Sequence, residues 1–161
     1  MRAFAAAAAS VLILVAAGCG WSPSSGNQAQ PNTCTAEQGP STDTVNAEIA
    51  KISGGQQWRE SARGNTTDCR LYWVQVASAA PASDAPGQVL FFDGGAPIGT
   101  PTPDPRPYIA VVNSSPDTVT VQYQWRQGQD KACCPTGIGT VRFQLADDGL
   151  KALDPIPGPQ A

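Results

Sequence analysis

The residues of this chain best suited to chemistry are its cysteines, two of which are adjacent. The sequence has 161 residues with 5 Cys and no His, and Cys133 and Cys134 stand side by side in DKACCPTGIG. Bridged to each other, they would close a strained eight-membered ring, because adjacent Cα atoms lie about 3.8 Å apart and disulfides prefer about 5.5–6 Å. Strained bridges are the labile ones, so this pairing predicts a disulfide redox protein that uses Cys133-Cys134.

The alternative use of the same cysteines is structural. Successive side chains of an extended segment point to opposite faces, so Cys133 and Cys134 could each reach a distant partner, Cys34 or Cys69. Such bridges would close loops of roughly 65–100 residues and stabilise the fold by about 4 kcal/mol each in the loop-entropy model. We expect this stapled arrangement and leave open which cysteine joins which. The chain has no CxxC spacing and no His, so we expect no metal and no cofactor.

Carboxylates are the next candidates, since a pair of them can hydrolyse a glycosidic bond. The candidates are Asp93, Asp104, Asp130 and the adjacent Asp147 and Asp148. Asp93 precedes Gly94-Gly95, and Asp147-Asp148-Gly149 has the composition of a hairpin turn, so both are better explained as turn residues. Without His, a Ser-His-Asp or Cys-His arrangement is impossible, and no phosphate-binding glycine motif occurs. We expect no catalytic residue, with a carboxylate-dependent envelope glycan hydrolase as an alternative.

One proline-rich loop has the composition of a binding surface. The segment GTPTPDPRPYI runs from Gly99 to Ile109, and its prolines favour a stiff, extended backbone. Arg106 and Tyr108 flank one of these prolines, and Arg and Tyr are enriched among residues that dominate binding. The competing interpretation is that the prolines protect a sheet edge from strand addition. Arg106 and Tyr108 are the candidate binding residues.

The N-terminus predicts an export signal that ends at a lipid anchor. Arg2 precedes an apolar run of about 15 residues, which is too short to span a bilayer core of about 30 Å. The run ends in AAGC, which is similar to the lipobox of bacterial lipoproteins, where cleavage leaves a diacylglycerylated Cys as the first residue. We therefore expect Cys19 to carry the lipid, with palmitate-type acyl chains, and two or more chains give stable anchoring where one does not.

Composition then divides the chain into a signal over 1–18, a Ser/Pro/Gly-rich tether over 19–42 and one domain over 43–157. Loss of Arg2 with the signal changes the formal net charge from −3 to −4. The lysines and arginines are scattered, so we expect no nucleic-acid partner.

The domain begins with a helix and continues with strands. A period near 3.6 predicts a helix over 43–52 with Asp43 as its cap, and the polar stretch 56–68 is expected to be a loop. Period-two alternation predicts strands over 69–78 and 88–95, the latter buried on both sides or nearly so. Hairpins are expected over 110–128 and 139–153. Their alternation predicts these inward side chains: Val119, Val121, Tyr123 and Trp125 in the first hairpin, and Val141, Phe143 and Leu145 in the second. We predict an α+β fold, with one N-terminal helix packed on a five- to six-stranded antiparallel meander, and an all-β sandwich as the alternative.

Three segments form a pattern: VLFFDGGAPIGTPTPDPRPY, TVTVQYQW and TGIGTVRFQL. These segments resemble the LppP/LprE lipoprotein family of mycobacteria and related actinobacteria. The resemblance covers roughly residues 43–157 together with the signal, and it implies an envelope lipoprotein without carrying over any catalytic residue. We expect a non-enzymatic protein, anchored in the cell membrane through Cys19 and facing outside the cytoplasm. Its role would be structural or the binding of an envelope protein, glycan or lipid.

Overall fold

The computed structural model describes residues 33–80 and 82–158. The predicted signal, Cys19 and the first part of the predicted tether lie outside the described residues. Structured elements begin with the short 3-10 helix η1 (Ala36–Gln38), inside the range that composition assigns to the tether. Among the described residues, no helix is long and apolar enough to cross a membrane.

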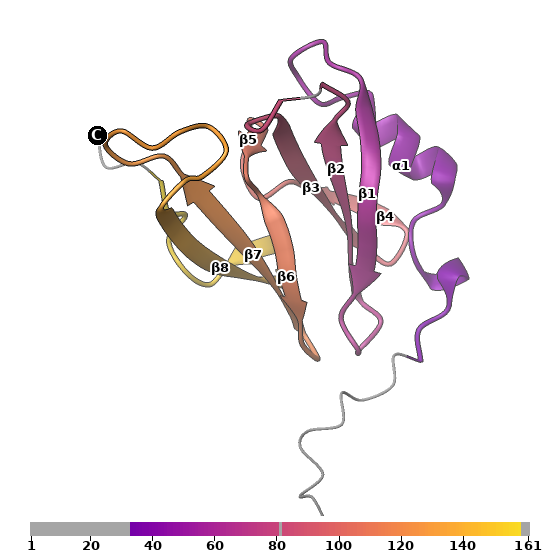
Figure 1. Ribbon diagram of the computed structural model, residues 1–161. Helices are drawn as coiled ribbons and strands as arrows, with labels where there is room; N and C mark the ends of the chain where they lie inside the picture. Colours follow the sequence, from indigo (N-terminus) through magenta and orange to yellow (C-terminus); the bar gives the residue numbers. More distant parts are fainter. Residues whose placement is uncertain (1–32, 81, 159–161) are drawn as a thin grey trace, which may run out of the picture.

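Nine strands of the described chain form two antiparallel sheets. The larger sheet has the order β1-β2-β3-β4, with β5 paired to β3, and the smaller sheet has the order β6-β7-β8-β9. The strands of the larger sheet are β1 (Trp58–Asn65), β2 (Leu71–Ser78), β3 (Pro86–Asp93), β4 (Ala96–Gly99) and β5 (Arg106–Pro107). Those of the smaller sheet are β6 (Ala110–Ser114), β7 (Thr118–Trp125), β8 (Gly137–Ala146) and β9 (Gly149–Ala152). Figure 1 shows the smaller sheet, the larger sheet and a helix as three successive layers.

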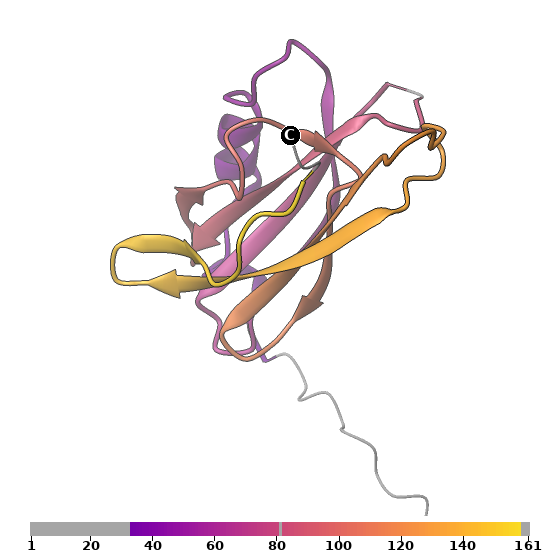
Figure 2. The same cartoon turned by 90° about the vertical axis from the view of Figure 1, so that its left-hand side faces the viewer.

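The helix α1 (Thr42–Ile49) covers the outer face of the larger sheet. It begins after Ser41, whose hydroxyl accepts a hydrogen bond from the Thr44 amide at 3.1 Å, so Ser41 rather than Asp43 caps it. The side chains buried in this outer layer are Val45, Tyr72, Val74, Val76, Leu90 and Phe92. Figure 2 looks onto the smaller sheet, with α1 behind the larger sheet and the β8–β9 hairpin projecting to one side.

The main core lies between the two sheets. It contains Leu71, Val89, Phe91, Ile109, Val119, Val121, Tyr123, Val141 and Phe143. Phe91 and Phe143 meet across the layers, with ring centroids 5.4 Å apart. Alternation along β7 and β8 sends every second side chain into this core, as the sequence predicts.

The predicted α+β fold is wrong, because the described chain is mostly β and contains only one short α-helix. The two sheets agree with the alternative of an all-β sandwich. The reason lies in β3, which is buried on both faces. Val89 and Phe91 contact the smaller sheet, whereas Leu90 and Phe92 lie under α1. A strand of this kind needs a layer on each side, and the helix supplies only one of them.

The residues before Cys69 are not the loop that their polarity predicts. Strand β1 spans most of this stretch and pairs with β2 along its length. It is an edge strand with mostly exposed side chains, so it carries no hydrophobic alternation for a sequence rule to detect. The strands over 69–78 and 88–95 and the two predicted hairpins are confirmed, each within a few residues.

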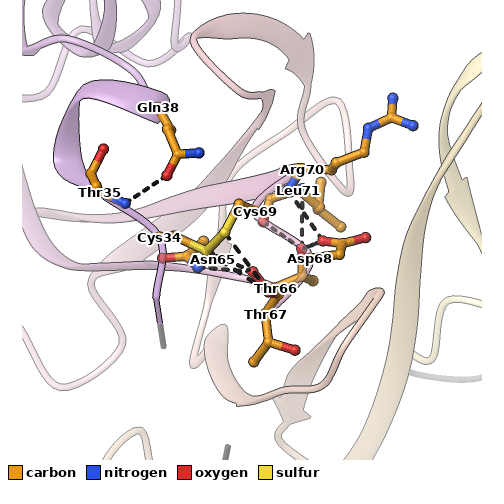
Figure 3. The surroundings of a disulfide bond; sticks show 10 residues. All are labelled: Cys34, Thr35, Gln38, Asn65, Thr66, Thr67, Asp68, Cys69, Arg70 and Leu71. Atoms are coloured by element: carbon orange, nitrogen blue, oxygen red, sulfur yellow. Dashed lines mark hydrogen bonds between the residues drawn. A yellow bond between two sulfur atoms is a disulfide. The ribbon is translucent and has the colours of Figure 1, made fainter. Parts of the chain in front are cut away.

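The disulfide connectivity differs from the predicted staple. Cys34 pairs with Cys69, with Cα atoms 5.4 Å apart, and Cys133 pairs with Cys134, with Cα atoms 3.8 Å apart. Figure 3 shows the first bridge beside the β1–β2 turn, where the buried Thr66 hydroxyl accepts a hydrogen bond from the Leu71 amide at 3.1 Å. The β1–β2 turn and the β7–β8 loop lie at opposite ends of the sandwich (Figure 1), so neither Cys133 nor Cys134 can reach Cys34 or Cys69.

Candidate functional site

The predicted binding loop, Gly99–Tyr108, is a fixed part of the fold. Gln88 of β3 is 1% exposed, and its side-chain amide donates a hydrogen bond to the Thr102 carbonyl at 3.0 Å. The loop ends in β5, which pairs with Pro86 and Gly87 of β3. It therefore covers part of the β3 edge, as the edge-protection interpretation expects, and it also delivers Arg106 and Tyr108 to one end of the sandwich.

At this end, Arg106 and Tyr108 line a cleft between the two sheets. The cleft has a volume of about 470 Å³, within the range of about 300–1,000 Å³ usual for small-molecule sites. Its lining residues are Asp84, Arg106, Pro107, Tyr108, Tyr123, Gln124, Trp125, Arg126, Pro157 and Gly158. Aromatic rings, prolines and two arginines thus meet at one place, from segments far apart in the sequence.

Arg106 lies over the inner wall of the cleft. Its guanidinium carbon is 5.9 Å from the centre of the Tyr123 ring, and Nη1 donates a hydrogen bond to the Pro157 carbonyl at 3.2 Å. A guanidinium has five donor hydrogens, so these contacts leave others available. The side chain is thus held at the cleft with donors to spare for a ligand.

Tyr123 forms the buried wall beneath Arg106. It is 2% exposed, and its hydroxyl has no hydrogen-bond partner among the described residues. Burial raises its pKa to about 12, with a small opposing effect from Arg106. Buried hydroxyls almost always have a partner, so this one is an exception that needs an explanation.

Trp125 lies across two glycines of the neighbouring strand. It pairs with Gly137 in the β7–β8 ladder, and a Cβ added to Gly137 would collide with the Trp125 indole. A Cβ added to Gly139 would come within 2.9 Å of the Pro157 ring. The GIG sequence therefore leaves room for an indole and a proline beside the cleft, which no larger residue would allow.

Tyr108 links the cleft to the loop that carries the adjacent cysteines. It has a φ of 57° at the junction of β5 and β6, a conformation that L side chains seldom adopt. Its hydroxyl donates a hydrogen bond to the Ala132 carbonyl at 2.5 Å. Asp130 braces the same loop by accepting hydrogen bonds from the Gln127 and Thr136 amides, both at 2.8 Å, and these bonds lower its pKa.

Carboxylates are sparse in the cavities of the described structure. The cleft has only Asp84, a second cavity of about 240 Å³ near Gly99 has only Glu48, and a third of about 250 Å³ near Cys34 has none. The candidate hydrolase carboxylates lie elsewhere: Asp93 pairs with Arg70, Asp130 braces a loop, and Asp147 and Asp148 form a turn. None of these three cavities offers the two carboxylates that a glycosidase needs.

No group of three or more His, Cys, Asp or Glu suited to a metal ion occurs within 33–80 and 82–158.

Of the predicted site residues, Arg106 and Tyr108 line the same cleft. The loop that carries Cys133 and Cys134 is linked to this cleft by the hydrogen bond between Tyr108 and Ala132. Trp125, Arg126 and the C-terminal Pro157 were not predicted as site residues. A Trp at the end of a strand, facing a Gly-x-Gly strand, is the pattern that could have revealed Trp125.

Comparisons with known proteins identify the family of this chain. The LppP/LprE lipoprotein family model matches residues 63–148, from β1 to the β8–β9 turn. Relatives named "Putative lipoprotein LppP" from Mycobacterium bovis and Mycobacterium tuberculosis are 49% identical over 148 residues, covering 89% of this chain and 85% of theirs. No solved structure matches significantly. The resemblance predicted from the sequence is confirmed, and the chain belongs to the LppP/LprE lipoprotein family, whose members are associated with the membrane of the cell envelope.

Proposed function

We propose that this lipoprotein is anchored through Cys19, faces outside the cytoplasm and binds a ligand without chemically changing it. The observation that carries the binding role is the cleft, where Arg106 and Tyr108 meet the aromatic wall of Tyr123 and Trp125. Apolar clefts with a few convergent polar groups are the usual form of a ligand site. A tether before the domain would hold this cleft away from the membrane surface.

The anchor is tested by Cys19→Ser in the producing cell. We expect the wild-type protein in the membrane fraction with a diacylglyceryl group on an N-terminal Cys19, as intact-mass spectrometry of the purified protein would show. The Ser variant should lose the lipid and leave the membrane fraction, because serine has no thiol to carry the diacylglyceryl group and no acyl chain is left to hold the protein. A mature N-terminus at another residue, or an unmodified Cys19, would contradict the anchor.

The binding role is tested by the double variant Arg106→Ala with Tyr108→Ala. Wild-type protein is incubated with envelope extract, re-isolated, and the retained molecules are identified by mass spectrometry. Loss of two such anchors should weaken retention by about 2 kcal/mol or more, or roughly 30-fold. The matched control is Arg59→Ala, which removes an exposed arginine from β1, the opposite edge strand. Equal retention by the wild type and the double variant would remove the binding role from this cleft.

A second candidate function is thiol–disulfide exchange at Cys133-Cys134. The specific observation is that these cysteines are bridged to each other and exposed, whereas Cys34 and Cys69 are half-buried. A substrate dithiol would attack the bridge through one thiolate and form a mixed disulfide. Its second thiol would then release both cysteines as thiols and leave the substrate as a disulfide, a transfer of two electrons and two protons.

This exchange is tested with a dithiol peptide in slight excess over the protein. Alkylation followed by peptide mass mapping should find Cys133 and Cys134 modified while Cys34 and Cys69 stay bridged. Reduction of both bridges at the same rate would contradict a dedicated exchange site, because no selectivity for the exposed pair would remain.

A further inference from the structure

Two arginines on the cleft form no close ion pair with a carboxylate among the described residues. The ion pairs of the described chain use Lys51, Arg63, Arg70 and Arg142. Arg106 contacts a carbonyl and an aromatic ring instead, and Arg126 is exposed at the rim. The protein as a whole has a formal net charge of −3, so two unpaired arginines on one cleft are a local concentration of positive charge.

The lining of the cleft has fewer carboxylates than arginines. Asp84 is exposed at the rim of the cleft and is the only carboxylate in its lining. Asp130 lies outside the lining and accepts hydrogen bonds from the Gln127 and Thr136 amides, and it keeps a negative charge that interacts with Arg126. Two arginines and one aspartate leave the lining itself positive, which favours an anionic ligand.

The remaining lining fits the uncharged part of a ligand. Tyr108 and Trp125 are both half-buried and both line the cleft, so part of each side chain packs against the protein and part is available to a ligand. Such rings offer planar, largely apolar contact area with little loss of side-chain freedom. Tyr123 is 2% exposed and forms the buried wall under Arg106, while its hydroxyl is buried out of contact with solvent.

The geometry points to a phosphate ester carried on a planar or apolar body as the ligand of this cleft, with the phosphate held by Arg106 and Arg126. This inference rests on the proposed binding role and specifies its chemistry. The arginines come from different segments, β5 and the end of β7. A phosphate monoester carries nearly two negative charges at pH 7 on three terminal oxygens, so it can neutralise two separate guanidinium groups, whereas a carboxylate carries one charge. Phosphate is therefore the better match for two arginines that line one cleft.

The test measures binding of defined probes to the full-length chain carrying Cys19→Ser, which keeps the domain and omits the lipid. Isothermal titration calorimetry compares phenyl phosphate, inorganic phosphate and the neutral phenyl glucoside. Phenyl phosphate should bind at least roughly tenfold more tightly than either partial probe, because only it uses both the arginines and the rings. Equal affinity for phenyl glucoside, or no binding of phenyl phosphate, would overturn the inference.

Charge-removing variants locate the phosphate. Arg106→Gln and Arg126→Gln should each weaken phenyl phosphate binding by roughly tenfold or more, as expected for a hydrogen-bonded charged group. Arg59→Gln removes the same charge from the opposite edge strand and should leave the affinity unchanged. Arg126 is exposed, so its variant remains informative even if Arg106→Gln disturbs the contact to Pro157. A loss of similar size in Arg59→Gln would mean a diffuse charge effect and would contradict the site.

Vesicles distinguish a lipid headgroup from a free phosphate ester. If the ligand is a lipid, phosphatidylglycerol vesicles should displace phenyl phosphate whereas phosphatidylcholine vesicles should not. If it is a soluble ester, neither vesicle should compete, and the phosphate chemistry still holds. The two proposals can fail separately. If the wild type retains an envelope molecule through Arg106 and Tyr108, and phenyl phosphate does not displace that molecule, then the binding role stands and only the phosphate inference is contradicted.

Discussion

Tyr108 and Tyr123 occupy the same cleft, yet their hydroxyls have opposite surroundings. The Tyr108 hydroxyl donates to a carbonyl, and the Tyr123 hydroxyl is buried with no partner among the described residues. A satisfied hydroxyl contributes to stability, whereas an unsatisfied buried one costs free energy. The same substitution should therefore act in opposite directions at the two positions.

We expect Tyr108→Phe to lower the free energy of unfolding by about 1 kcal/mol, because the Ala132 carbonyl loses its donor. Tyr123→Phe should leave stability unchanged or raise it by up to about 1 kcal/mol, because it removes an unpaired buried group. Urea denaturation of the two variants against the wild type checks this. A marked loss of stability in Tyr123→Phe would show that its hydroxyl does have a partner.

A second residue-scale effect concerns pH. Hydrogen bonds from the Arg142 side chain and amide lower the pKa of Asp154 to about 2. Because this pKa lies below the unfolded value of about 3.9, the contribution of the pair to stability is complete above about pH 4 and is lost as the pH falls towards 2. The pair fixes the segment that leads to Pro157, so acid should also loosen one wall of the cleft.

NMR titration of the Asp154 carboxyl carbon should give a midpoint near pH 2 in the wild type. In Arg142→Gln the midpoint should move up towards the ordinary aspartate value of about 3.9, since the guanidinium donors are gone. An Asp154 midpoint that is the same with and without Arg142 would contradict the assigned cause.

Among the secondary-structure elements, the packing of β3 against the smaller sheet holds the two layers together. Phe91 of β3 and Phe143 of β8 are 0% and 2% exposed, and their rings meet between the sheets. Such a contact lets neither layer move without opening a cavity, because protein interiors are close-packed. The outward positions of β8 carry no such constraint.

Phe143→Ala should lower the free energy of unfolding by about 3–5 kcal/mol, because it removes a buried ring and leaves a cavity. Ile138 lies on the same strand but is 59% exposed, so Ile138→Ala should change it by no more than about 0.5 kcal/mol. Thermal or urea unfolding of both variants makes the comparison. Similar losses in the two would mean that β8 does not face the larger sheet as described.

For the molecule as a whole, the two disulfides have different consequences. Cys34–Cys69 joins residues 35 positions apart and attaches the segment before α1 to the larger sheet. Cys133–Cys134 closes almost no loop, so it removes little freedom from the unfolded chain. Only the first bridge should therefore contribute much to global stability.

We expect the double replacement of Cys34 and Cys69 by Ala to cost about 3–4 kcal/mol in the loop-entropy model. The same replacement of Cys133 and Cys134 should cost about 1 kcal/mol or less and leave the fold intact. Calorimetric unfolding of the two variants separates these outcomes. A large loss from the second replacement would mean that the adjacent pair supports the β7–β8 loop and, through Ala132 and Tyr108, the cleft.

The amino-acid sequence alone was enough for the family, the two hairpins and the inward alternation of β7 and β8. These features depend on residues only a few positions apart, such as Asp147-Asp148-Gly149 at a turn. The sequence also indicated that β3 is buried on both faces, and the structure confirms this. Burial on both faces requires a layer of structure on each side of the larger sheet. It did not reveal β1, because an edge strand with exposed side chains has no hydrophobic period.

The cysteine pairing and the cleft were decided only by tertiary structure. Cys34 meets Cys69 because η1 and the β1–β2 turn lie at one end of the sandwich, and no local pattern encodes which ends coincide. Likewise Arg106, Trp125 and Pro157 line one cleft only after two sheets have packed face to face. Such contacts arise from the burial of whole layers, which depends on all the strands together and on no single segment.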